Sequence, residues 1–259
     1  MKNKTEVKNT STVNTERLVG TDKQNKVPFA VVEAYKTTRI HLISTLNKIN
    51  GKIVAISSPN AAEGKSTTAV NIAIALSQLN KKILIIDADS RRSTIHKKLK
   101  MENELGCLDI ICGSASFDDA KKSYNEYLDI ITAGTQTNNP SELFSNDKFE
   151  EFLNEIRDSY DYIIIDTPPI NLVSDALVIA QKCDGLLLIV RADITTYEAF
   201  KRTITSTTEL NINVLGVVIN GTDSERSYKY DKYRKYGYGR YGYYRYRSSY
   251  YGQSQSNRK

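Results

Sequence analysis

Short apolar runs, each bounded by polar or turn-forming residues, recur along most of this chain. They lie at Ile53–Ser57, Ile83–Asp87, Leu128–Thr132, Tyr162–Asp166, Gly185–Arg191 and Asn213–Asn220. Most of them lack the apolar/polar alternation of a strand with one face in solvent, so they favour strands covered on both faces. We therefore predict a mainly parallel β-sheet.

Helical patterns fill the gaps between these runs. They cover about Ala30–Leu46, Lys65–Leu79, Asp147–Ser159, Ser174–Cys183 and Thr196–Leu210. The alternation predicts a doubly wound α/β fold with helices on both faces of the sheet, in one domain over residues 27–224. Ligands of such folds bind at the carboxyl ends of the strands, which directs attention to the residues there.

The two ends of the chain have a different composition. Residues 1–26 are polar, and residues 225–259 contain no Ile, Leu, Val, Phe or Met. Neither segment can bury enough apolar surface to offset the entropy of ordering it, so both are expected to be disordered tails. The C-terminal tail has ten Lys and Arg residues against two acidic ones, a formal charge of +8. It also has 11 of the 17 tyrosines: Tyr228, Tyr230, Tyr233, Tyr236, Tyr238, Tyr241, Tyr243, Tyr244, Tyr246, Tyr250 and Tyr251.

A phosphate-binding loop follows the first apolar run. Residues 58–67 read Ser-Pro-Asn-Ala-Ala-Glu-Gly-Lys-Ser-Thr and lead into a helix. Such a loop uses its glycine for close backbone approach to phosphate, its lysine for the β- and γ-phosphates and its serine for Mg²⁺. The full motif has a glycine where this chain has Pro59, and Gly-Lys-Ser alone also suits an ordinary helix start, but the flanking strand and helix favour a P-loop NTPase fold. The expected nucleotide-binding residues are Glu63, Gly64, Lys65, Ser66 and Thr67.

Carboxylates follow two of the apolar runs. Asp87 ends the run Ile83–Asp87 and Asp89 follows two residues later, while Asp166 ends the run Tyr162–Asp166. Each aspartate alone would suit a turn or a helix cap equally well. Beside a phosphate-binding loop they predict a site for a nucleotide with Mg²⁺, because Mg²⁺ prefers hard oxygen ligands.

One carboxylate more than the metal requires suggests chemistry beyond hydrolysis. A tyrosine phenol has a pKa of about 10 and is protonated at neutral pH, so its attack on a γ-phosphate is helped by an aspartate that accepts the proton. Hydrolysis would need only a positioned water. The tyrosine-rich tail supplies the phenols.

These features together resemble the bacterial tyrosine kinases, in particular the type whose cytoplasmic ATPase domain is a separate chain in capsular and exopolysaccharide systems of Gram-positive bacteria. The resemblance covers about Val27–Asn220 and the tail. It implies ATP-dependent phosphorylation of the tail tyrosines and influence on polysaccharide synthesis and export. It further implies activation by the cytoplasmic segment of a transmembrane adaptor, a cognate tyrosine phosphatase and a homo-oligomer, for which a ring is one form.

The resemblance also assigns expected roles to residues. Lys65 would bind the β- and γ-phosphates, Ser66 and Asp87 would hold Mg²⁺ with Asp166 supporting it through water, and Asp89 would accept the proton. The division between Asp87 and Asp89 stays open. Asn220 lies where related folds contact adenine, although a polar cap at a strand end is an equal alternative. The family's oligomerisation motif corresponds to Glu33, Lys36 and Arg39, with lysine in place of the middle arginine, and ordinary intrahelical ion pairs would explain the same spacing.

Two other functions stay open from the residues. A positioning ATPase of the ParA/MinD type shares the fold and the strand-end acids, but it has a lysine four residues before the last glycine of the loop, where this chain has Asn60. A nucleic-acid-binding module would use the Arg/Tyr/Gly mixture of the tail. It would leave the nucleotide site unexplained, so no nucleic-acid partner is expected.

The remaining expectations concern compartment and packing. The three cysteines have neither zinc-ligand spacing nor a paired framework, so they are expected to be small buried residues. No apolar run has the length of a membrane span or a signal peptide, so the chain is expected to be cytoplasmic and recruited to the inner face of the membrane by the adaptor. Packing is the expected role of the other tyrosines: Tyr35, Tyr124, Tyr127, Tyr160, Tyr162 and Tyr197.

Overall fold

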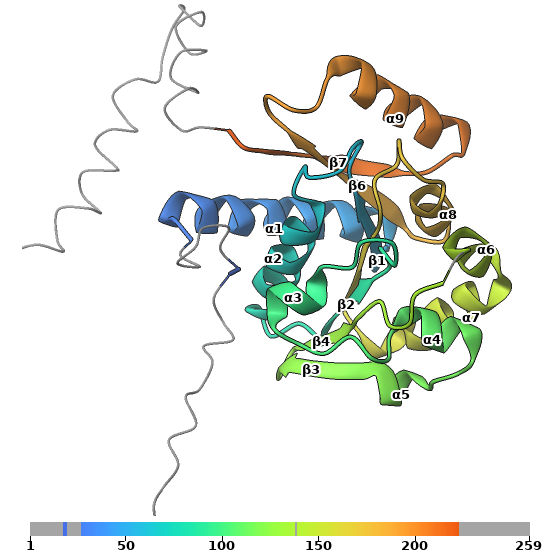
Figure 1. The fold of residues 1–259 in the computed structure, drawn as a ribbon. Coiled ribbons are helices and arrows are strands. Elements are labelled where there is room, and N and C mark those ends of the chain that lie inside the picture. Colours follow the sequence, from blue (N-terminus) through green and yellow to red (C-terminus); the bar gives the residue numbers. More distant parts are fainter. Residues whose placement is uncertain (1–17, 20–26, 138, 223–259) are drawn as a thin grey trace, which may run out of the picture. The chain divides into compact units, whose positions relative to one another are not determined.

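The computed structural model describes residues 18–19, 27–137 and 139–222. In this part of the chain, seven strands form one sheet in the order β3-β4-β2-β5-β1-β6-β7 (Figure 1). They are β1 Ile53–Ser57, β2 Ile83–Asp87, β3 Lys121–Asn125, β4 Leu128–Ile131, β5 Tyr162–Asp166, β6 Gly185–Arg191 and β7 Val214–Asn220. Neighbouring strands are parallel except β3 and β4, which confirms the mainly parallel sheet.

Helices pack on both faces of this sheet, as the sequence predicts (Figure 1). They are α1 Phe29–Ile49, α2 Lys65–Ser77, α3 Ile95–Leu99, α4 Cys107–Cys112, α5 Phe117–Ala120, α6 Pro140–Ser145, α7 Asp147–Ile156, α8 Asp175–Gln181 and α9 Tyr197–Glu209. A short 3₁₀ turn, Arg157–Ser159, follows α7. Because side chains alternate along a strand, Val54 and Ile56 pack in one cluster with α1, α2 and α3, whereas Ile53 packs in another with α4, α6 and α7. The sheet is therefore the middle layer of three.

The strand register brings the carboxylates together. Asp87 of β2 is the direct neighbour of Asp166 of β5, and Asp166 is also the neighbour of Ile56 of β1. The phosphate-binding loop leaves β1 one residue later, at Ser57. Parallel strands end at the same edge of a sheet, so the loop and both acids share the carboxyl edge.

Several elements differ from the sequence predictions. Strand β3 was not predicted, because Lys-Lys-Ser-Tyr-Asn is a polar edge strand with little apolar signal. Helices α3 to α6 were missed because each has only four to six residues, too few for a helical period. The packing expected for Tyr197 is wrong, since 73% of this residue is exposed. Burial of all three cysteines is also wrong, since Cys112 is exposed.

Most of the two predicted tails lies outside the described residues. These are residues 225–259 and residues 1–26, apart from Leu18 and Val19. The domain boundaries at residues 27 and 224 stay predictions. Among the helices that the structure describes, none combines the length and apolarity that crossing a bilayer requires.

Candidate active site

The phosphate-binding loop adopts a conformation that requires its glycine. Gly64 has φ of 97°, and Ala62 has φ of 63°, so two residues lie in the left-handed region. A Cβ atom at position 64 would also lie 2.6 Å from Nδ2 of Asn220. Helix α2 begins directly after it at Lys65, so the loop presents a helix N-terminus to the carboxyl edge, a favourable place for an anion.

Glu63 holds the loop from inside. Its side chain is fully buried and accepts hydrogen bonds from the Asn60 amide at 2.8 Å, Asn60 Nδ2 at 3.2 Å and Thr195 Oγ1 at 2.6 Å. The Glu63 carboxylate is therefore engaged within the protein, and a contact of this residue with a nucleotide would come from its backbone.

Strand ends of β6 and β7 brace the same loop. Asn220 donates through Nδ2 to the Glu63 carbonyl and to Thr68 Oγ1, both at 3.1 Å. Arg191 donates through Nη1 to the Ala62 carbonyl at 3.2 Å. The structure thus brings Asn220 to the loop, but its amide nitrogen is occupied there, and the adenine contact stays a prediction.

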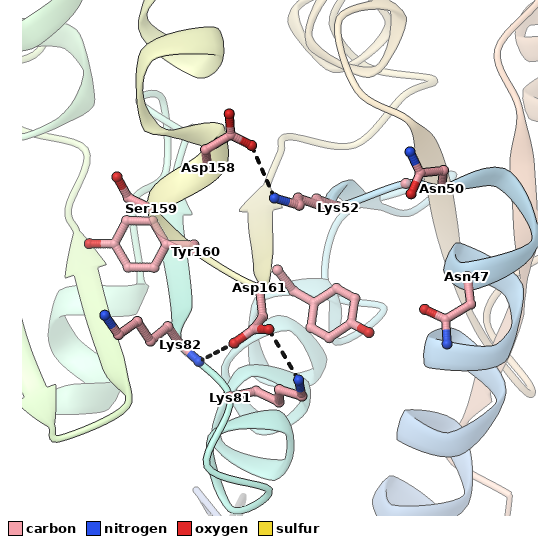
Figure 2. A pocket seen from close by; sticks show the side chains of 11 residues that line it. Asn47, Asn50, Lys52, Lys81, Lys82, Asp158, Ser159, Tyr160 and Asp161 are labelled. Atoms are coloured by element: carbon pink, nitrogen blue, oxygen red, sulfur yellow. Dashed lines mark hydrogen bonds and ion pairs between the residues drawn. The ribbon is translucent and has the colours of Figure 1, made fainter.

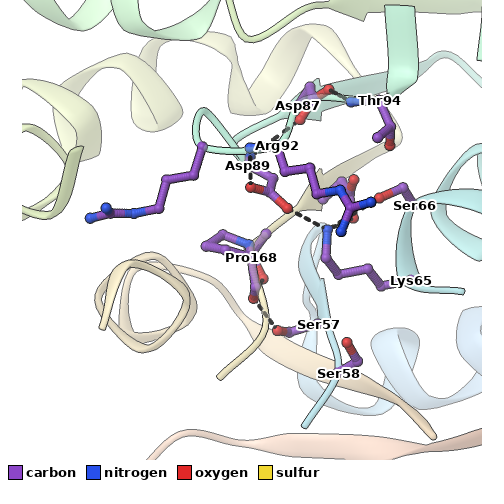
Figure 3. A network of polar contacts seen from close by, with 12 residues as sticks. Ser57, Ser58, Lys65, Ser66, Asp87, Asp89, Arg92, Thr94 and Pro168 are labelled. Carbon is purple, nitrogen blue, oxygen red and sulfur yellow. Dashed lines mark hydrogen bonds and ion pairs between the residues drawn. The ribbon is translucent and has the colours of Figure 1, made fainter. Parts of the chain in front are cut away.

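Lys65 lies at the centre of a buried ionic network (Figure 3). Its Nζ donates to Asp89 Oδ2 at 2.7 Å and to Ser66 Oγ at 3.2 Å, and it lies 3.7 Å from Asp166 Oδ1. Burial opposes the charge, but Asp166 and Asp89 outweigh it and raise the pKa of Lys65. The lysine therefore carries a firm positive charge in contact with the carboxylates predicted from the sequence.

Asp87 and Asp166 have different surroundings. Asp87 accepts hydrogen bonds from the amides of Asp89, Thr94 and Ile95, so it binds the N-terminal end of α3. Neither oxygen of Asp166 accepts a hydrogen bond from any described residue, although the side chain is fully buried. Burial, with their mutual repulsion added at Asp87, raises the pKa of both, to about 8 for Asp87. The pair thus resists carrying two negative charges without a cation.

This arrangement fits Mg²⁺ bound together with a nucleotide. Asp166 accepts no hydrogen bond from the described residues and has the Lys65 ammonium only at 3.7 Å, so this buried carboxylate can take a further cation. Within the described ranges, no cluster of three or more His, Cys, Asp or Glu residues is arranged to hold a metal. Mg²⁺ is commonly held by one or two carboxylates together with substrate phosphates and water, so Ser66, Asp87 and Asp166 would be its protein ligands only when phosphates complete the site.

Sequence reasoning missed two residues of this region. Lys98 donates to Thr67 Oγ1 at 2.8 Å, and Thr195 donates to Glu63. Lys98 follows two other basic residues, His96 and Lys97, and resembles a solvated surface run, while Thr195 lies in a loop without a motif. The one sequence signal for Thr195 is that it lies in the segment that follows Arg191, the predicted end of a strand.

The predicted oligomer motif is only partly exposed. Glu33 and Lys36 form an ion pair with each other at 2.8 Å, whereas Arg39 donates through Nη1 to the Ala75 carbonyl near the end of α2. Arg39 thus stabilises the packing of α1 on α2, and its part in oligomerisation stays a prediction. All 11 tail tyrosines, from Tyr228 to Tyr251, lie outside the described residues.

Comparisons with known proteins agree on the family. A family model described as an AAA domain matches residues 51–212. Tyrosine-protein kinase YwqD of Bacillus subtilis is 34% identical over 79% of this chain and 86% of its own length. Putative tyrosine-protein kinase CapB of Staphylococcus aureus is 34% identical over 80% of this chain and 92% of its own length.

A solved structure supports the same conclusion. The kinase domain of the Escherichia coli tyrosine kinase ETK is 28% identical and superposes with a TM-score of 0.73, over 81% of this chain and 80% of that one. The region matched by the AAA-domain model, residues 51–212, contains both the phosphate-binding loop and the strand-end aspartates. The chain belongs to the family of bacterial tyrosine-protein kinases.

Proposed function

We propose that this tyrosine kinase transfers the γ-phosphate of ATP to tyrosines of its own C-terminal tail, residues 225–259. The observation that supports it most is the contact of Lys65 with Asp89 at the N-terminus of α2, beside Asp166. A phosphate-binding cation and a proton acceptor thus meet at one edge of the sheet, and the chain itself carries 11 phenols in the tail.

The chemistry follows from these contacts. An ATP phosphate competes with Asp89 for the Lys65 ammonium, and Asp89 is then free to accept a proton. The tyrosine oxygen forms a bond to the γ-phosphorus, the bond from that phosphorus to ADP breaks, and the phenol proton moves to Asp89. Lys65 stabilises the charge on the transferred phosphate.

Mg²⁺, held by Ser66, Asp87 and Asp166, would neutralise negative charge on the phosphates. Asp87 also accepts from the amides of Thr94 and Ile95 at the start of α3, which fixes its carboxylate in place. Asp89 instead has Lys65 on one oxygen and the Arg92 amide on the other. These surroundings support Asp89 as the proton acceptor and Asp87 as the metal ligand.

Phosphorylation would change the charge of the tail. Each phosphate adds roughly −1.5 to −2 charges, so a few of them reverse the tail's charge of +8. A tail that loses its positive charge loses its attraction to anionic surfaces and alters contacts between copies of the chain. Transfer to the tail is thus also a switch.

The cellular setting completes the proposal. The chain regulates capsular or exopolysaccharide synthesis and export, in the cytoplasm and at the inner face of the membrane. A transmembrane adaptor recruits and activates it through a cytoplasmic segment, a tyrosine phosphatase reverses the modification, and copies of the chain assemble into a homo-oligomer. The similarity to proteins named tyrosine-protein kinases supports the kinase activity on which this setting depends.

Two alternatives account for less. A positioning ATPase would use a lysine at position 60, but Asn60 has no charge and is hydrogen-bonded to Glu63. A nucleic-acid module would leave the ionic network of Lys65 unused. Membership of the tyrosine kinases therefore favours phosphotransfer.

Labelling with radioactive ATP tests the proposal. Full-length protein is incubated with Mg-ATP and the adaptor's cytoplasmic segment, beside a variant in which all 11 tail tyrosines are Phe. The proposal expects label in the wild type and almost none in the variant. Equal labelling of both, or hydrolysis of ATP without phosphotyrosine, would show that the tail is not the substrate.

A further inference from the structure

Lys98 approaches the phosphate-binding helix from a neighbouring element. It lies on α3, whose first amides donate to Asp87, and its Nζ donates to Thr67 Oγ1 at 2.8 Å. Thr67 belongs to the first turn of α2, two residues after Lys65. A second ammonium group therefore reaches the N-terminus of the helix that carries the phosphate-binding lysine.

The charge of Lys98 is poorly compensated there. The side chain is partly buried, its hydrogen-bond acceptor is a neutral hydroxyl, and none of the described carboxylates lies within ion-pair distance of it. Burial lowers the pKa of Lys98, Asp166 partly offsets this, and the positive charge of Lys65 lowers it further. Lys65 is compensated by Asp89, whereas Lys98 has only a hydroxyl, so beside a helix N-terminus the missing partner of Lys98 is an anion.

We propose that Lys98 is a second phosphate-binding cation of the nucleotide site, which would contact a nucleotide phosphate bound beside Thr67. The inference deepens the proposed function and depends on its nucleotide-binding step. Helix α3 would then have two functions, because its N-terminal end positions Asp87 and its last turn carries Lys98. A lysine outside the Gly-Lys-Ser motif thereby adds affinity for the nucleotide.

The neighbouring lysine provides the matched control. Lys97 lies on the same short helix and carries the same charge, but it is exposed. A general effect of net charge, or of the helix composition, would treat the two positions alike. A phosphate contact is specific to Lys98.

Calorimetric binding of ATP and of ADP to the full chain, with excess Mg²⁺, tests the proposal. Lys98→Met is expected to weaken binding of both nucleotides roughly ten- to hundredfold, the usual effect of a charge-assisted hydrogen bond, while Lys97→Met stays within about twofold. Lys98→Arg is expected to retain most of the affinity, because it keeps the charge. Thr67→Val is expected to lose less than Lys98→Met, because it removes only the hydroxyl.

Thermal unfolding without nucleotide separates binding from a structural role. If Lys98 serves to bind phosphate, the melting temperature of Lys98→Met without nucleotide should equal or exceed that of the wild type, because the variant removes a poorly compensated cation. Unchanged ATP affinity in Lys98→Met, or equal losses in Lys98→Met and Thr67→Val, would overturn the inference. Normal nucleotide affinities with no tail phosphorylation in the wild type would instead refute only the kinase proposal, whereas a wild type that binds no ATP would refute both.

Discussion

Lysine–aspartate pairs lie at both edges of the sheet, and their surroundings differ. At the amino edge, where the parallel strands begin, Lys81 and Asp161 line a polar hollow of about 550 Å³ (Figure 2). They pair at 3.1 Å, and 46% and 38% of their side chains are exposed. At the carboxyl edge, Lys65 and Asp89 pair at 2.7 Å with 10% and 5% exposed (Figure 3). The pair that lines the hollow is therefore the more exposed of the two.

Burial of the paired charges distinguishes the carboxyl edge, where the candidate active site lies. In solvent, an ion pair costs little and contributes little, so Lys81 and Asp161 need no ligand to explain them. Buried charges are expensive unless they are compensated, and Asp166 has no hydrogen-bond donor among the described residues. A Mg²⁺ ion bound together with nucleotide phosphates would compensate the negative charge of these buried carboxylates.

The largest expected effect is that of Lys65→Met. Removal of the phosphate-binding cation is expected to lower the rate of phosphotransfer about a thousandfold, because developing charge on the phosphate loses its stabilisation. The rate of ADP formation measures it. Lys81→Met makes the same chemical change at the amino edge, and a comparable loss there would remove the distinction between the two edges.

Asp89→Asn is expected to have the next largest effect. An amide cannot accept the phenol proton, so phosphotransfer should fall about a hundredfold while ATP affinity stays near that of the wild type. Steady-state kinetics and calorimetry check the two quantities separately. Asp161→Asn is the control, and a selective loss of ATP affinity in Asp89→Asn would assign this residue to binding.

A smaller effect concerns pH. Because folding raises the pKa values of Asp87 and Asp166, these two groups hold more protons in the folded chain than in the unfolded chain between pH about 4 and about 8. The free energy of unfolding should therefore fall as pH rises through this window, with a melting temperature about 3 °C lower at pH 8.5 than at pH 6.5 when Mg²⁺ and nucleotide are absent.

Asp166→Asn sharpens the pH prediction. The amide imitates the protonated acid, so this contribution to the decline should disappear, and the rise in melting temperature that Mg-ATP is expected to cause in the wild type should be lost. Scanning calorimetry at the two pH values measures both. A decline that persists in full in Asp166→Asn would mean that Asp166 does not contribute to it, and would leave Asp87 as the source at this edge.

The smallest effect is expected at the amino edge. Lys81→Ala removes an exposed pair and should change the free energy of unfolding by less than about 1 kcal/mol. Urea denaturation measures it. A change of several kcal/mol would mean that the exposed pairs of the hollow are structural and that exposure is a poor guide in this fold.

The sequence predicted the parts of the fold that repeat a simple pattern. Continuous apolar runs identify β1, β2 and β5, because strands buried on both faces need no polar alternation. Strand β3 could not be predicted in the same way, because its edge position tolerates a polar sequence. Short helices such as α3 depend on tertiary packing and leave no period.

In the candidate site, too, some residues could be predicted from the sequence and others could not. Lys65, Asp87 and Asp166 stand at motif positions or strand ends, so their convergence follows from a parallel sheet. The engagement of Glu63 with Thr195 and the approach of Lys98 to Thr67 join segments more than 30 residues apart, and no local pattern encodes them. Contacts of this kind follow only from the folded chain.

Phosphosite mapping tests the central claim most directly. Full-length wild type, Lys65→Met and Lys81→Met are incubated with Mg-ATP and the adaptor's cytoplasmic segment, and phosphotyrosine is located by mass spectrometry. We expect phosphotyrosine confined to residues 228–251 in the wild type and in Lys81→Met, and none in Lys65→Met. Equal modification of all three proteins, or phosphotyrosine only at body positions such as the exposed Tyr197, would contradict it.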